Sequence, residues 1–139
     1  MTPVEVQVPL PASTSMDEVK KLLSAAGLTA LSDINWTADC AEGDGPPVLL
    51  IFVSSDTTGT EGLEPAVRQM VSRGGRVIGV WPVGGGFDVL PAALEDYGAG
   101  SSNWNPEALR NAICAQGSDW RDSSGGIRDQ RPIDRNKNC

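Results

Sequence analysis

The chain has 139 residues and a net charge of −7, which disfavours nucleic acid as a main partner because phosphate binding needs a basic surface. It contains no histidine, so neither a Ser-His-Asp triad nor a Cys-His nucleophile can form. The three cysteines lack the paired spacing of a structural zinc site, and we expect no bound metal. A chain of this length can fold as one domain without a metal or a disulfide.

No apolar stretch approaches the roughly 20 residues of a membrane-spanning helix. Residues 1–6 lack the basic start and apolar centre of a secretory signal. The sequence therefore predicts a cytoplasmic protein that does not contact a membrane.

The first part of the chain alternates between strand and helix patterns. Residues 4–10 alternate apolar and polar side chains, which predicts a half-exposed strand. Ser15 and Glu18 stand at the spacing of a capping box, and the apolar stripe that follows ends at Gly27, which predicts a helix over 16–26. Residues 28–36 form a further strand candidate. Residues 37–47, with their glycines and prolines, predict a loop.

The centre of the chain predicts one β-α-β unit. Residues 48–53 and 76–81 are apolar runs typical of strands buried on both faces, and apolar residues recur at helical spacing over 62–73. Two strands joined by such a crossover must run parallel. We expect them to be adjacent or nearly adjacent at the centre of a sheet, with the helix packed across them.

The last elements are shorter. Pro91 suits the first turn of a helix predicted over 91–97, and residues 101–104 predict an edge strand. Asn105 is placed to cap a last helix that starts at Pro106 and buries three apolar side chains, those of Leu109, Ala112 and Ile113.

Residues 121–139 carry five basic and three acidic groups, so this tail has a charge of +2 and the first 120 residues have −9. It offers too little apolar surface to fold by itself. We expect a domain over 1–120 and a basic, loosely structured tail over 121–139 that contacts a protein partner or another copy of the chain.

Ligands of open α/β sheets bind outside the carboxyl ends of the strands, which makes the loops 54–60 and 82–88 the expected site. The predicted ligand-binding residues are Ser54, Ser55, Asp56, Thr58, Thr60, Trp81, Gly84, Gly85 and Asp88. A purely structural alternative stays open: the polar groups of the first loop can cap the helix, the glycines can form a turn, and Trp81 can pack in the core.

Glu61 and Glu64 stand three residues apart at the start of the central helix and so share one face. Either carboxylate can simply interact with the helix dipole. Glu64 is the candidate catalytic carboxylate, and Glu61 is the second choice.

Three segments resemble a TIR domain: the strand and serine-ended loop 48–55, the helix with Leu63-Glu-Pro-Ala66, and the strand and proline of 75–82. The resemblance implies a three-layer α/β domain with a mainly parallel, flavodoxin-like or TIR-like sheet of four to five strands and helices on both faces.

TIR domains either self-associate in immune signalling or cleave NAD with a glutamate on the helix after the serine-ended strand. Glu64 matches that glutamate. The resemblance therefore implies a domain of a bacterial-type defence or signalling system that recognises NAD or a related nucleotide, or acts as an adaptor. If it is an enzyme, it is similar to an NAD glycohydrolase. The alternative is a non-enzymatic protein-interaction module.

Residues 57–61 also resemble the phosphate loop of flavodoxins, with one residue fewer between the glycine and the last threonine. This resemblance implies an FMN or nucleotide binder as a minor alternative. In flavodoxins, however, the loop follows the first strand.

Overall fold

The computed structural model describes residues 2–7, 10, 14–40, 45–53, 63–82, 94 and 97–114, with only the backbone described for Leu63 and Glu64. Within these residues the order is β1 (Thr2–Val6), α1 (Met16–Ala25), β2 (Thr29–Ala30), β3 (Asn35–Ala38), β4 (Val48–Phe52), α2 (Leu63–Ser72), β5 (Arg76–Val80), β6 (Gly100–Ser102) and α4 (Pro106–Cys114). Leu94 and Tyr97 also have helical backbone.

The unit β4–α2–β5 forms as the sequence predicts. All five residues of β4 are buried, and β4 pairs with β5 in parallel from Val48 opposite Arg76 to Phe52 opposite Val80. Helix α2 contacts both strands. It ends at Ser72. Gly74, two residues later, has a φ of 80°, in the left-handed region that favours glycine, and Gly75 N–H donates to the Met70 carbonyl at 2.9 Å. The predicted pairing and direction of these strands are confirmed, with β4 central in the sheet and β5 next to the edge strand β6.

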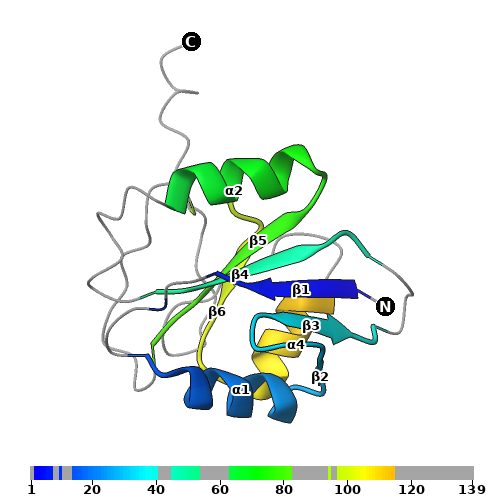
Figure 1. Ribbon diagram of the computed structural model, residues 1–139, viewed down its shortest axis with the longest axis vertical. Helices are drawn as coiled ribbons and strands as arrows, with labels where there is room; N and C mark the ends of the chain where they lie inside the picture. Colours follow the sequence, from blue (N-terminus) through cyan, green and yellow to red (C-terminus); the bar gives the residue numbers. More distant parts are fainter. Residues whose placement is uncertain are drawn as a thin grey trace.

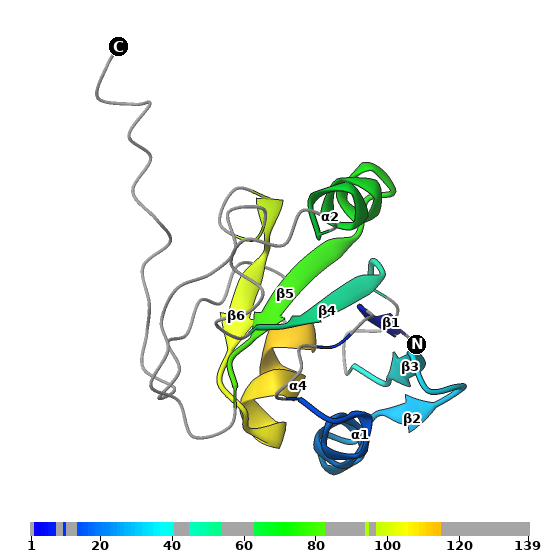
Figure 2. The same cartoon turned by 60° about the vertical axis from the view of Figure 1, so that its left-hand side comes forward.

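The sheet has six strands in the described residues, in the order β2-β3-β1-β4-β5-β6 (Figure 2). Strands β1, β4, β5 and β6 run parallel, and β3 is antiparallel to β1. Without the two-residue β2, the order becomes 2-1-3-4-5 in chain numbering, which is the flavodoxin-like order apart from the direction of β3. The fold is thus a mixed, mostly parallel α/β fold, with one or two strands more than predicted.

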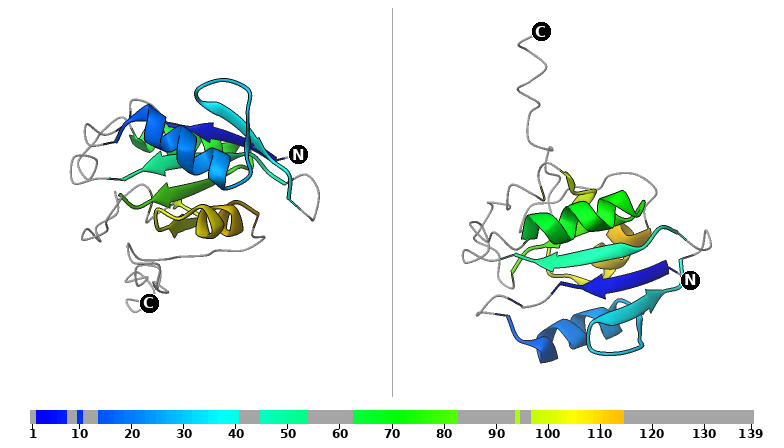
Figure 3. Two further views of the ribbon diagram at one scale, coloured as in Figure 1. Left: turned by 90° about the horizontal axis from the view of Figure 1, so that it is seen from below. Right: turned by 45° about the horizontal axis from the view of Figure 1, so that its top comes forward.

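Helices cover both faces of the sheet, which makes three layers (Figure 1). Helices α1 and α4 lie together on one face, and α2 lies on the other (Figure 3). We call the apolar cluster between the sheet and the first pair the α1/α4 core; it includes Val4, Leu23, Leu50, Phe52, Val80 and Leu109. The cluster under α2 is the α2 core, formed by Leu49, Ile51, Val53, Val67, Met70, Val77, Trp81 and Leu94.

Both predicted helix caps are present. Glu18 N–H donates to Ser15 Oγ at 3.2 Å at the start of α1, and Ala108 N–H donates to Asn105 Oδ1 at 2.9 Å at the start of α4. Leu109, Ala112 and Ile113 are buried as predicted. The local sequence signals are sufficient here because a cap and an apolar stripe act within a single helix.

The segment predicted as one strand over 28–36 is instead a tight antiparallel hairpin. The N–H groups of Leu31 and Ser32 donate to the Asn35 carbonyl, and Asn35 N–H donates to Ser32 Oγ, which closes the turn between β2 and β3. Strand β3 then continues to Ala38, into the segment predicted as a loop, because Trp36 and Ala38 alternate into the α1/α4 core. Strand β1 likewise starts at Thr2 and ends at Val6, earlier than predicted, since Thr2 pairs with Ala38.

Candidate functional site

The carboxyl ends of β1, β4, β5 and β6 meet at one edge of the sheet, which we call the carboxyl edge. The structure brings Val53, Trp81 and Asn103 to the same level there, one residue beyond the paired residues Phe52, Val80 and Ser102. Val53 N–H donates to the Val80 carbonyl and Trp81 N–H to the Ser102 carbonyl, each at 2.9 Å, so the strands stay in register at this point. This is the edge where ligands of open α/β sheets bind.

Side chains at this edge alternate between the two faces. Phe52 and Val80 pack in the α1/α4 core, whereas Val53 and Trp81 pack in the α2 core. Trp104 points to the α1/α4 side as well, since its ring packs edge-on against Phe52 with centroids 5.6 Å apart. Asn103, between Ser102 and Trp104, therefore belongs to the side of the sheet that carries α2.

Trp81, one of the predicted ligand-binding residues, is fully buried in the α2 core. An indole that is covered on all sides has no face left on which a base or nicotinamide can stack without rearrangement of its neighbours. The packing alternative considered for Trp81 thus accounts for its position, and a ligand contact by this ring remains a prediction.

Glu64 lies in the first turn of α2, on the chain that leaves the carboxyl end of β4. Its side chain is outside the described residues. The same holds for Glu61 and for all other predicted ligand-binding residues, namely Ser54, Ser55, Asp56, Thr58, Thr60, Gly84, Gly85 and Asp88. Their roles stay predictions, as does the role of the tail 121–139, which also falls outside the described residues.

Sequence reasoning missed Asn103. Its Oδ1 atom is buried without a hydrogen-bond partner, and it is the only buried side-chain nitrogen or oxygen of this kind in the described part of the chain. The signal that could have found it is its place directly after a short strand at the carboxyl edge.

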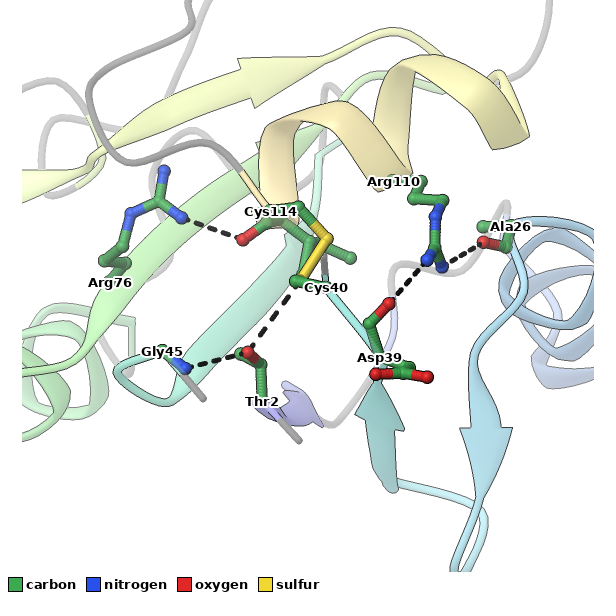
Figure 4. The surroundings of a disulfide bond; sticks show 9 residues. Thr2, Ala26, Asp39, Cys40, Gly45, Arg76, Arg110 and Cys114 are labelled. Atoms are coloured by element: carbon green, nitrogen blue, oxygen red, sulfur yellow. Dashed lines mark hydrogen bonds between the residues drawn. A yellow bond between two sulfur atoms is a disulfide. The ribbon is translucent and has the colours of Figure 1, made fainter. Parts of the chain in front are cut away.

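The opposite edge of the sheet holds a disulfide that the sequence analysis did not expect (Figure 4). Cys40, just after β3, bonds to Cys114, the last residue of α4, with their Cα atoms 5.4 Å apart and 74 residues between them in sequence. Thr2 Oγ1 donates to Cys40 Sγ at 3.9 Å and accepts from Gly45 N–H at 3.1 Å. The sequence analysis named no cysteine pair, because pairing depends on the tertiary approach of β3 and α4.

Two arginines bind helix ends around this disulfide (Figure 4). Arg110 donates to the carbonyls of Ala26, at the end of α1, and Asp39 at 3.2 and 2.6 Å. Arg76 donates to the Ile113 carbonyl in the last turn of α4 at 3.0 Å, and its partial burial lowers the pKa of the guanidinium. Cationic side chains at helix carboxyl ends satisfy free carbonyls and interact favourably with the helix dipole. The role of these two arginines is therefore structural: they fix α4 against the end of α1 and against β5.

A cavity of about 200 Å³ also opens near the amino ends of β1 and β4, beside the end of α2. Its charged lining residues are Glu5 and Arg73, and Leu31, which is 69 % exposed, also lines it. It lies at the opposite end of the strands from the loops that the sequence predicts as the site. One carboxylate and one guanidinium do not form a convergent set of catalytic groups.

The strand order and directions make this an α/β domain with a mixed, mostly parallel sheet, which is compatible with the flavodoxin-like arrangement. The chain matches no protein-family model, and the comparisons with curated proteins and with solved structures found no match. Among helices in the described segments, none has the length and apolar character needed to cross a membrane.

Proposed function

We propose that the chain is a TIR-like domain of a bacterial-type defence or signalling system, which recognises NAD or a related nucleotide as an effector or acts as an adaptor through self-association. The observation that supports this proposal most is the position of Glu64. It lies in the first turn of α2, directly after β4, and β4 is the third strand of a 2-1-3-4-5 order. The resemblance over 48–82 matches the catalytic glutamate of NAD-cleaving TIR domains to this residue.

A carboxylate at this position has a defined chemical task. When the bond between nicotinamide and ribose breaks, positive charge develops on the ribose, and a fixed negative charge nearby lowers the energy of that transition state. Glu64 would supply the charge from the start of α2. The loops 54–60 and 82–88 would hold the nucleotide on either side of it.

Replacement of Glu64 by Gln tests the enzymatic form of the proposal. Glu64→Gln is expected to melt at the wild-type temperature and to lose nicotinamide release, because the amide keeps the shape of the side chain and removes its charge. Release is measured by chromatography after incubation with NAD, at protein concentrations high enough to drive self-association. Glu61→Gln, three residues earlier in the sequence, is the matched control and should retain the activity.

Full activity in Glu64→Gln would contradict the catalytic assignment, and loss of activity in Glu61→Gln alone would move the assignment to the second choice. Absence of nicotinamide release from the wild-type protein, with and without candidate activators, would leave the adaptor form of the proposal. The FMN alternative has less support, because residues 57–61 follow β4, whereas the flavodoxin loop follows the first strand.

The second candidate function is a non-enzymatic protein-interaction module that self-associates or binds a partner through the tail 121–139, and the disulfide bears on the compartment in which either form would act. Disulfides persist in oxidising compartments and are rare where thiols are kept reduced. A permanent Cys40–Cys114 bond would therefore disagree with the cytoplasmic location that we propose for the NAD-recognising form.

The thiol state in the cell tests the predicted cytoplasmic location. Cells expressing the chain are quenched with acid, free thiols are alkylated, and the peptides that contain Cys40 and Cys114 are measured by mass spectrometry. Alkylation of both cysteines is expected for the cytoplasmic, NAD-recognising form. A fully oxidised pair would contradict the cytoplasmic location, and Cys139 serves as an internal reference for thiol reactivity.

A further inference from the structure

The buried Oδ1 atom of Asn103 needs a hydrogen-bond donor. An unpaired polar atom that is shielded from water destabilises the folded protein, so native proteins seldom leave one without a water, an ion or a ligand to satisfy it. Most buried polar groups elsewhere in the described segments find partners. The exception lies at the carboxyl edge, where a ligand is expected on fold grounds alone.

The backbone around Asn103 is fixed by other hydrogen bonds. The Asn103 carbonyl accepts from Ser102 Oγ and from Asn105 N–H, each at 2.8 Å, and the preceding carbonyl of Ser102 accepts from Trp81 N–H. The next residue, Trp104, packs against Phe52. Strand pairing on one side and aromatic packing on the other thus fix the backbone from which the Asn103 side chain extends.

The register places this side chain on the face of the sheet that α2 covers. Asn103 is level with Val53 and Trp81, whose side chains pack in the α2 core, and α2 carries Glu64 in its first turn. Neighbouring strands lie about 4.8 Å apart, so the end of β6 is roughly 10 Å from the end of β4. A nicotinamide riboside can extend over such a separation, with its ribose near β4 and its carboxamide near β6.

We propose that Asn103 Oδ1 accepts a hydrogen bond from the carboxamide N–H of a nicotinamide nucleotide bound at the carboxyl edge. The inference rests on the proposed function and adds to it the residue that selects the ligand. Oδ1 is shielded from solvent, so the residues that cover it must move before a ligand N–H reaches it. A carbonyl oxygen without a partner then favours a ligand that brings such a donor. It disfavours a ligand that brings a carboxylate to the same place, because two acceptors then face each other.

The ligand itself supplies the first test. NAD and its nicotinic acid analogue, which has a carboxylate where NAD has the carboxamide, are titrated separately into the wild-type protein by calorimetry. The wild-type protein is expected to bind NAD about tenfold more tightly or better, which is the effect of one buried hydrogen bond and one unpaired acceptor. Equal or tighter binding of the analogue would overturn the inference without any variant.

Asn103→Leu supplies the second test, since leucine is close in size and has no acceptor. The variant is expected to unfold at or above the wild-type temperature, because the unpaired atom is gone, and to lose the preference for NAD over the analogue. Ser101→Ala, a buried residue of the same strand, is the matched control and should keep the preference.

The outcomes separate this inference from the proposed function. A wild-type protein that binds neither dinucleotide would overturn this inference and the NAD-recognising form of the proposed function, and would leave only the adaptor form. A wild-type protein that binds NAD with preference, together with an Asn103→Leu variant that keeps that preference, would overturn only the role of Asn103. If Asn103→Leu fails to fold, Asn103→Ala is measured in the same two titrations.

Discussion

Removal of the Cys40–Cys114 disulfide is expected to lower the free energy of unfolding by about 4 kcal/mol. The bond closes a loop with a sequence separation of 74 residues, and chain entropy gives a stabilisation of that size for such a loop. The measurement is the urea unfolding midpoint of wild-type protein with and without reductant, and of the double variant Cys40→Ala, Cys114→Ala.

Three comparisons sharpen this experiment. Reduced wild type and the double variant should unfold at similar urea concentrations, since both lack the cross-link. Cys139→Ser is the matched control and should unfold like oxidised wild type. An identical midpoint for oxidised and reduced wild type would contradict the expected stabilisation.

The bond also bears on how α4 is held. Arg76 and Arg110 bind backbone carbonyls on either side of the disulfide, so α4 retains two charged contacts after reduction. We therefore expect the reduced protein to stay folded in the absence of denaturant. Its amide protons in α4 should nevertheless exchange faster than those in β4, because the helix has lost its covalent link.

Replacement of Trp81 by Ala is the second change with a large expected effect, about 4 kcal/mol of destabilisation. Its ring is fully buried in the α2 core beside Val53 and Leu94, and deletion of a buried aromatic side chain leaves a cavity that the surroundings fill only in part. Urea unfolding of Trp81→Ala measures the loss. Tyr97→Ala, an aromatic residue that is 43 % exposed, is the control and should cost much less.

This experiment also separates the two roles considered for Trp81. A packing residue loses stability when it is truncated, and ligand binding falls only as the folded fraction falls. If Trp81 instead stacked on the ligand, Trp81→Ala would unfold at the wild-type urea midpoint and bind NAD more weakly. That second result would contradict the packing role assigned to the buried ring.

The sequence by itself determined the elements whose signals are local. The two doubly buried strands, the helix between them and the capped helices α1 and α4 were all predicted close to their observed bounds. Each of them depends on residues within a few turns of one another: an apolar period, a cap or a glycine stop. Parallel pairing of β4 and β5 also followed, since a helical crossover allows no other direction.

Only the tertiary structure decided the features that join distant residues. The hairpin over 29–38 depends on β3 pairing with β1, and the disulfide depends on β3 and α4 meeting across 74 residues of sequence. The face to which Asn103 belongs, and the burial of Trp81, follow from the register of three strands. Such contacts are set by packing and strand pairing rather than by local propensity, and a single sequence carries no pattern for them.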